Sequence, residues 1–260
     1  MIKCAMGVAL AGGMRAFASP KRSAVAARHI VGGAEAPWTN PYDHDGMLEF
    51  WDAEWNGGGG VHDSSSSTCL PLVDGGAVME FGSNSVLRDN YVDCTSGGGL
   101  IVADCPNLIS ATDNRRVAFP RTIVWCMRFN AYKQGGRVIR LGLTGNDTSI
   151  YSMDGYNVKW VFLGSQYDGS GMSPADNVLA TIGVVAVSGD IRLYINGTDQ
   201  RVSTNTFLWC IGGGLAFLCN AAFDSNVVNG MFYNAMMYDH GLTTAELDAI
   251  HAINQTRFGA

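Results

Sequence analysis

One stretch near residue 190 constrains the fold of this chain more than any other. Residues 184–202 read VVAVSGDIRLYINGTDQRV, in which small or polar residues separate the apolar ones. Residues 188–190 (Ser-Gly-Asp) supply a three-residue turn, and residues 196–197 (Asn-Gly) are a strong signal for a two-residue hairpin. Ile191 and Leu193 share one face of the strand between the turns, because side chains alternate along a strand. The stretch therefore predicts antiparallel β-strands joined by two successive hairpins.

Length and composition favour one large β-domain. The chain has 260 residues, of which 33 are glycine and 15% are charged. A helical bundle contains more charged residues than this, whereas β-sandwiches of similar length form single domains. The net charge is −6, but residues 1–37 carry five Lys or Arg and one Glu, so that +4 lies there and −10 in the remainder. We expect no nucleic-acid partner for so acidic a domain, and no membrane span.

The hairpin and the C-terminal segment carry a family resemblance. LYING at residues 193–197 resembles a hairpin of the laminin-G-like and concanavalin A-like lectin/glucanase superfamily. Near the C-terminus, Thr243 and Glu246 have capping-box spacing. A strand followed by a short capped helix is typical of the same group. The resemblance implies an all-β, concanavalin A-like antiparallel β-sandwich (jelly roll) over residues 38–260, with an N-terminal arm over residues 1–37 and a short C-terminal helix.

The hydrophobic pattern predicts further strands along the sandwich. The segment 137–143 is expected to be the hairpin partner of the apolar segment 121–132, across a turn that contains two glycines. The other strands are expected at 46–53, 68–73, 77–81, 91–93, 100–103, 149–153, 158–163, 208–211, 215–218 and 230–238.

A second resemblance concerns the segment that follows the first strand. It is similar to lectin-like proteins of bacteriophages and prophages of gut bacteria, in which Asp, Asn, a Gly-rich turn and His-Asp follow one another. The match is partial, because Cys69 or Leu70 stands where that group has Trp. The residues that match are Asp52, Asn56, Gly58, Gly60, His62, Asp63, Leu72, Asp74 and Gly75 or Gly76.

The phage resemblance implies a place in a virus particle. We expect a structural or accessory protein of a phage virion, located on the particle surface and used in host attachment. Residues 1–37 would bind other virion subunits, and a homo-oligomer is a further expectation. Its ligand would be a glycan of the host surface or of mucus.

Four residues are candidates for glycan binding: Trp55, His62, Asp63 and Trp160. A sugar needs an aromatic ring for its apolar face and a few polar groups for its hydroxyls. Asp52 and Asp63 are weaker candidates as calcium ligands, and no other cofactor is expected. The alternative for this loop is structural, with Asp63 accepting backbone hydrogen bonds and Trp55 packing on a neighbour.

The prediction about enzymatic activity depends on the spacing of the acidic residues in and after the first strand. Some glucanases of this fold carry Glu-x-Asp-x-x-Glu, whereas Glu49, Asp52 and Glu54 give Glu-x-x-Asp-x-Glu here. Glu49 and Asp52 then point to opposite faces, but retaining hydrolysis needs two carboxyl groups about 5 Å apart. We therefore predict a protein without enzymatic activity. Two alternatives stay open, a glycan-active hydrolase of the same fold and a purely structural cementing subunit without a ligand.

The cysteines give little support to a disulfide framework. There are seven of them, with no Cys-x-x-Cys pair and no zinc-like spacing. An odd number in a domain of this size favours buried free thiols, which pack as small apolar side chains.

Overall fold

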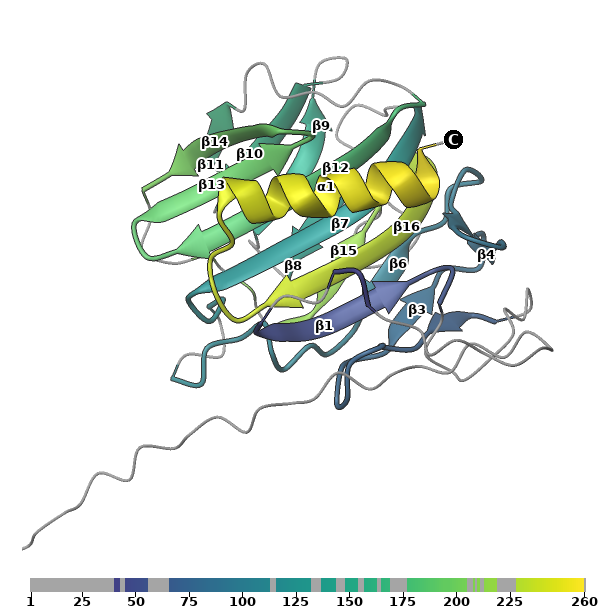
Figure 1. Cartoon of the computed structure of the whole chain (residues 1–260), viewed down its shortest axis with the longest axis horizontal. Coiled ribbons are helices and arrows are strands. Elements are labelled where there is room, and N and C mark those ends of the chain that lie inside the picture. Colours follow the sequence, from purple (N-terminus) through teal and green to yellow (C-terminus); the bar gives the residue numbers. More distant parts are fainter. Residues whose placement is uncertain are drawn as a thin grey trace, which may run out of the picture.

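Two antiparallel β-sheets pack face to face, with one helix outside them, in the computed structural model of the chain (Figure 1). The predicted all-β sandwich with a short C-terminal helix is confirmed. The predicted arm, residues 1–37, and the loop 56–65 lie outside the described part. The structure describes residues 40–42, 45–55, 66–112, 116–131, 137–143, 148–153, 157–162, 165–168, 177–204, 208, 210, 213–218 and 228–259. For residues 131, 137, 148–153, 157–162 and 165–168 it describes only the backbone.

The first sheet brings the two ends of the described chain together. β16 pairs with β7, with β5 and with β1, the first strand of the sandwich. The order is β14 (Thr198–Ser203), β13 (Asp190–Ile195), β12 (Leu179–Val187), β7 (Arg121–Ala131), β16 (Asn229–Tyr238), β5 (Val92–Asp93) and β4 (Val86–Leu87), with β1 (Met47–Asp52) beside β16.

The second sheet faces the first across the core. Its neighbouring strands are also antiparallel, and most of them follow one another in the sequence, except that β15 pairs with β8 on one side and with β6 on the other. The order is β11 (Ser165–Asp168), β10 (Asn157–Phe162), β9 (Thr148–Met153), β8 (Arg137–Leu141), β15 (Leu215–Phe217), β6 (Leu100–Val102), β3 (Met79–Phe81) and β2 (Thr68–Cys69).

The two successive hairpins predicted near residue 190 are confirmed. β12 pairs with β13, and β13 pairs with β14. Gly189 has φ +74°, and Asn196 and Gly197 have φ +47° and +91°, as a turn of the Asn-Gly type requires. Leu193 packs into the core between the sheets, as expected. Tyr194, on the other face, is buried as well, because the helix covers it.

The core between the sheets is filled by large side chains from both. Trp125 and Phe217 meet edge to face, with ring centroids 6.1 Å apart, and Phe217 lies 5.4 Å from Phe232. β7 is buried on both faces. Trp125 belongs to the core between the sheets, and Val124 to the apolar layer beneath the helix.

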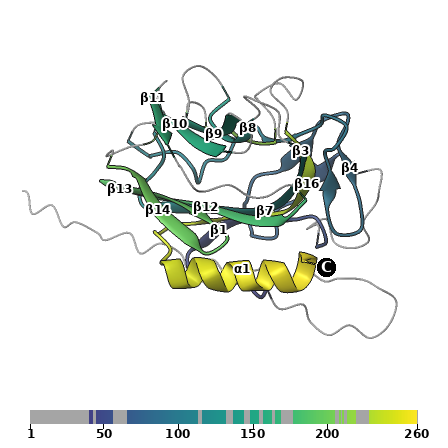
Figure 2. The same cartoon turned by 90° about the horizontal axis from the view of Figure 1, so that it is seen from above.

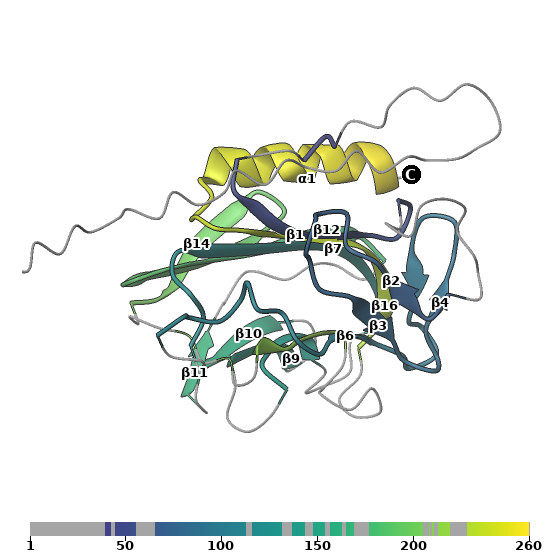
Figure 3. The same ribbon diagram turned by 90° about the horizontal axis from the view of Figure 1, so that it is seen from below.

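The helix α1 (Thr244–Phe258) lies on the outer face of the first sheet, away from the second one (Figures 2 and 3). The predicted capping box is present, since Thr243 accepts from the Glu246 amide and Glu246 accepts from the Thr243 amide. Leu247 and Ile250 are fully buried against the sheet. Within the described part of the chain, no helix combines the length and the apolar character needed to cross a membrane.

One predicted hairpin is wrong. β8 does not pair with β7 but lies in the second sheet, between β9 and β15. The sequence between them contains residues suited to a hairpin turn, but β7 is hydrogen-bonded to β12 on one edge and to β16 on the other. The chain therefore crosses from one sheet to the other, and Ile139 and Leu141 of β8 fill the core from the far side.

Other differences from the predicted strands are small. β9 and β10 pair as expected. β2 has two residues instead of six, and β4 and β11 were not predicted. No strand is found at the described residues 208 and 210. The five cysteines that the structure describes are buried free thiols, namely Cys69, Cys94, Cys105, Cys126 and Cys210.

Candidate functional site

The end of β1 forms a tight turn around the carboxylate of Asp52. Its Oδ1 accepts hydrogen bonds from the backbone amides of Glu54 (3.0 Å) and Trp55 (3.1 Å). An Asp side chain that binds the backbone two and three residues ahead fixes the direction of the chain. The Asp52 side chain has no exposed surface, whereas that of Glu54 is 40% exposed. This turn therefore sets where Trp55 lies.

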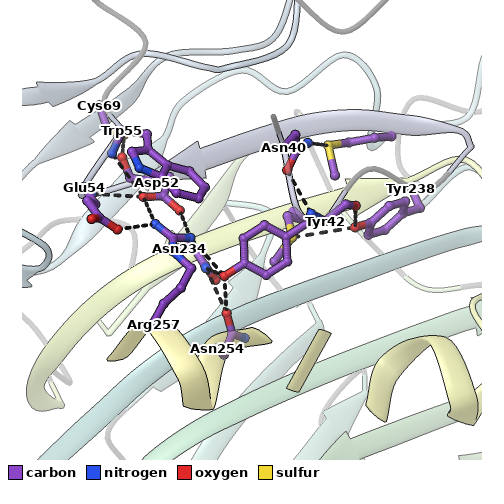
Figure 4. A network of polar contacts seen from close by, with 12 residues as sticks. Asn40, Tyr42, Asp52, Glu54, Trp55, Cys69, Asn234, Tyr238, Asn254 and Arg257 are labelled. Carbon is purple, nitrogen blue, oxygen red and sulfur yellow. Dashed lines mark hydrogen bonds and ion pairs between the residues drawn. The ribbon is translucent and has the colours of Figure 1, made fainter. Parts of the chain in front are cut away.

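Arg257, in the last turn of α1, binds both carboxylates of this turn (Figure 4). Its Nη1 donates to Oδ2 of Asp52 at 2.7 Å and its Nη2 to Oδ1 at 3.0 Å. The same Nη2 donates to Oε2 of Glu54 at 2.6 Å. The guanidinium carbon lies 3.4 Å from the centroid of the Trp55 ring, which is a stacking contact. We call Asp52, Glu54, Trp55 and Arg257 the Trp55 cluster.

Burial and charge act against each other in this cluster. Burial raises the pKa of Asp52, and the hydrogen bonds and charge of Arg257 counteract part of that rise. Burial also disfavours the Arg257 cation, but its hydrogen bonds with Asp52 and the charge of that carboxylate outweigh this and raise the pKa of Arg257. Arg257 is therefore a permanent cation, and two carboxylates share it.

A buried polar network ties the cluster to the sheet. Oδ1 of Asn254 accepts from the Tyr42 hydroxyl (2.7 Å) and from Nδ2 of Asn234 (3.0 Å). Nδ2 of Asn254 donates to Thr181 of β12 at 3.0 Å. Nη1 of Arg257 also donates to the Tyr42 hydroxyl at 2.9 Å. Such a network fixes one orientation of the helix end, because any shift would leave buried polar groups without partners.

Aromatic rings extend the cluster along the end of α1. The guanidinium of Arg257 lies 4.3 Å from the ring centroid of Phe258, whose ring is 4.8 Å from that of Tyr233. Tyr233 in turn lies 6.0 Å from Tyr91. The inner rings, Phe258 and Tyr233, are buried, whereas Trp55 and Tyr91 at the two ends are half-buried. The row thus presents an aromatic ring at each end.

Glu49 lies on the opposite face of β1, as predicted. Its Oε1 accepts from Nδ2 of Asn107 at 2.7 Å, and its Oε2 accepts from the Ala77 amide at 2.8 Å. The side chain is fully buried. Glu49 is therefore separated from Asp52 by the strand itself, and the acidic pair that the structure brings together is Asp52 with Glu54.

The structure describes only two of the four predicted glycan-binding residues, Trp55 and Trp160. Trp55 packs on Arg257, and His62 and Asp63 lie outside the described residues. Trp160 belongs to β10, opposite Ile150 and Tyr167, and its side chain is not described.

The predicted calcium ligand Asp52 is already engaged. Two backbone amides and a guanidinium bind its carboxylate, so a calcium ion there would have to displace Arg257. Groups of three or more metal-binding side chains are absent from the part of the chain that the structure describes.

Sequence reasoning missed most of the groups around Trp55. No role in the site was predicted for Arg257. Tyr42, Asn234 and Asn254 were not singled out at all. No local pattern links them, because they come from three segments that meet only in the folded chain.

Comparisons with known proteins show the fold. No family model and no curated protein matches the sequence. Trypanosoma rangeli sialidase in complex with sialic acid superposes with a TM-score of 0.60 at 12% identity, over 91% of this chain and 37% of that one. Domain 4 of AbnA, a GH43 extracellular arabinanase from Geobacillus stearothermophilus, in complex with arabinotriose, gives 0.57 at 13% identity, over 79% of this chain and 98% of that domain. The chain thus spans only about a third of the sialidase.

These similarities correct one prediction and support another. The prediction that the protein has no enzymatic activity was wrong. The same sandwich occurs in a sialidase and in an arabinanase, which are enzymes that act on glycans. A β-sandwich with such relatives is compatible with the concanavalin A-like superfamily expected from the sequence. At these identities the similarity establishes the architecture and leaves the chemistry to the site.

Proposed function

We propose that this chain is the glycan-binding sandwich of a glycan-hydrolysing protein, with Trp55 as its main contact. The observation that carries the proposal is the fold shared with nearly the whole of an arabinanase domain that was solved in complex with arabinotriose. That domain corresponds to 79% of this chain, so the likeness includes most of the sandwich.

The Trp55 cluster has the chemistry that sugar binding needs. The half-buried ring of Trp55 offers an aromatic surface for the apolar face of a sugar. The carboxylate of Glu54, 40% exposed, lies beside it and accepts hydrogen bonds from sugar hydroxyls. Because Arg257 holds both residues in place, the cluster is organised before a ligand arrives, which lowers the entropic cost of binding.

A glycan array, read with and without calcium, tests this proposal. We expect the full chain to bind an oligosaccharide, Trp55→Ala to lose that binding, and Trp55→Phe to retain part of it. Val178→Ala changes an exposed apolar residue outside the Trp55 cluster and serves as the control. Loss of binding in calcium-free buffer would support the predicted calcium ligand Asp63. Equal binding by Trp55→Ala and the unmodified chain would contradict the proposed contact.

A second candidate function is hydrolysis by the chain itself. Asp52 and Glu54 both accept from Nη2 of Arg257, at 3.0 and 2.6 Å, so their oxygens are no farther apart than the sum of these distances. That is close to the ~5 Å spacing of retaining glycosidases. The full burial of Asp52 keeps it from a glycosidic bond in this conformation, which is why binding is the main proposal. Release of reducing sugar by the full chain, and its loss in Glu54→Gln, would establish hydrolysis.

We also propose, from the sequence resemblance, that the protein is part of a phage virion. The pattern around residues 52–76 and the basic segment 1–37 support this location. Detection of the protein in purified particles tests the location. Light scattering of the full chain and of a chain lacking residues 1–37 tests whether this segment joins it to other virion subunits or to further copies of itself.

A further inference from the structure

We propose that the Trp55 cluster selects neutral glycans and rejects those that carry carboxylate or sulfate groups. This inference rests on the proposed function, because it names the class of sugar that the same site would bind. It also separates two kinds of ligand seen in the similar structures, since arabinotriose is a neutral oligosaccharide and sialic acid carries a carboxylate.

The first step is that the cation of the cluster is already engaged. Nη1 of Arg257 donates to Asp52 and to the Tyr42 hydroxyl, and Nη2 donates to Asp52 and Glu54. One face of the guanidinium is stacked on Trp55. The Arg257 side chain is only 11% exposed, so an incoming anion cannot reach it without displacing a carboxylate.

The second step is the charge of the surroundings. One guanidinium and two carboxylates give the Trp55 cluster a net charge of −1. In the sequence, residues 29–87 contain no Lys or Arg. Among the described residues, Arg128 also reaches this end of the helix, where its Nη2 donates to the carbonyl of Phe258 at 3.2 Å.

These two steps decide between the ligands. A carboxylated sugar stacked on Trp55 would lie near the exposed carboxylate of Glu54, and the cation of the cluster, Arg257, already binds the two carboxylates. A like charge at a few ångströms in water weakens binding by about fivefold. A neutral sugar meets no such repulsion, and its hydroxyls donate to the same carboxylate.

The experiment compares matched neutral and acidic oligosaccharides on the full chain. Arabinotriose, lactose and sialyllactose are titrated by calorimetry, and an array of neutral glycans and their sialylated or sulfated counterparts extends the set. We expect the neutral member of a pair to bind about fivefold or more tightly, with a smaller difference at high salt, because salt screens exposed charges.

Glu54→Gln tests the cause of the selection. The amide keeps an oxygen for Arg257 but removes the charge, so we expect binding of the acidic member to improve about fivefold while the melting temperature changes little. Unchanged discrimination in this variant would overturn the inference.

The possible failures are distinguishable. Equal or tighter binding of the acidic glycans would overturn the selection of neutral sugars and leave the proposed glycan binding intact. No binding to any member of the array would overturn the proposed function, and this inference with it.

Discussion

Arg257 and Asp52 are 205 positions apart in the sequence and form a two-bond ion pair where the end of α1 meets the end of β1. Neither side chain is open to solvent, since Asp52 is fully buried and Arg257 is 11% exposed. The pair joins the first strand of the sandwich to its last helix. It therefore holds the C-terminal end of the helix against the first strand, and it also fixes the turn that carries Trp55.

Removal of Arg257 should destabilise the protein strongly. Arg257→Met leaves the buried carboxylate of Asp52 without its cation, and the loss of one partner from a buried pair costs about 3 kcal/mol or more. The free energy of unfolding in urea measures this loss. Arg201→Met is the matched control, because Arg201 pairs with Asp190 at 2.7 Å but is 58% exposed. An exposed pair contributes less than about 1 kcal/mol, so equal losses in the two variants would contradict a stabilising role for the buried pair.

Asn254 should be the most sensitive polar residue of the helix. Asn254→Ala removes partners of the Tyr42 hydroxyl, the Asn234 amide and the Thr181 hydroxyl, all beneath α1. Buried groups without partners cost about 1–3 kcal/mol, so we expect a loss in that range from urea unfolding. Gln255→Ala, on the exposed side of the same helix turn, should change stability by less than about 0.5 kcal/mol. A small loss for Asn254→Ala would show that the network adds orientation without stability.

His251 should make the stability of the protein depend on pH near neutrality. Its Nδ1 lies 3.1 Å from the Thr181 hydroxyl, and burial lowers the pKa of the imidazole from its ordinary value of 6.5, with Asp248 counteracting part of this. The unfolded chain therefore binds a proton first as the pH falls. The contribution of His251 to the free energy of unfolding is therefore fully present above about pH 6.5, and it is lost as the pH falls through the lowered pKa.

His251→Gln should remove this part of the pH dependence. The measurement is the melting temperature of both proteins between neutral and mildly acidic pH. The difference between them should shrink or reverse at acidic pH, because only the unmodified chain carries the titrating group. His240→Gln removes a more exposed histidine, beside Asp239, and is the control. A difference in melting temperature between the unmodified chain and His251→Gln that stays the same at every pH would contradict the prediction.

The sequence predicted those parts of the molecule that depend on neighbours along the chain. The turn at Asn196 and the cap at Thr243 are local, because their hydrogen bonds and dihedral angles involve residues within a few positions. The opposite directions of Glu49 and Asp52 follow from the alternation of side chains in a strand. Each of these features is present in the structure as expected.

The remaining features depend on contacts between distant segments. Strand β8 joins the second sheet because β7 already has a partner on each edge, which the turn between them does not reveal. The sequence named Trp55 and Asp52, but the residue that organises them comes from the far end of the chain. A stacking contact between Trp55 and Arg257 has no signature in either segment, so the Trp55 cluster could be recognised only after folding.

The side chain of Asn196 should stabilise the protein beyond its role in forming the hairpin turn. Asn196 has φ +47°, its Oδ1 accepts from the Thr181 amide at 2.7 Å, and its Nδ2 donates to the Leu179 carbonyl at 3.1 Å. Asn196→Ala removes both hydrogen bonds and places an alanine in the left-handed region, which together should cost about 3 kcal/mol. Gly189→Ala at the other turn is the control for the strain alone, because φ is +74° there and an added Cβ meets nothing within 4 Å.

The comparison of the two turns separates strain from anchoring. We expect Gly189→Ala to lose about 1 kcal/mol in urea unfolding, and Asn196→Ala to lose clearly more. The excess measures how firmly the Asn196 side chain fastens the hairpin to β12. Tyr194, two residues before the turn, hydrogen-bonds Asp248 of α1 at 2.8 Å, so a loosened hairpin should also weaken the contact with the helix. Equal losses in the two variants would mean that the side-chain bonds of Asn196 contribute no stability and that the hairpin is held by its backbone alone.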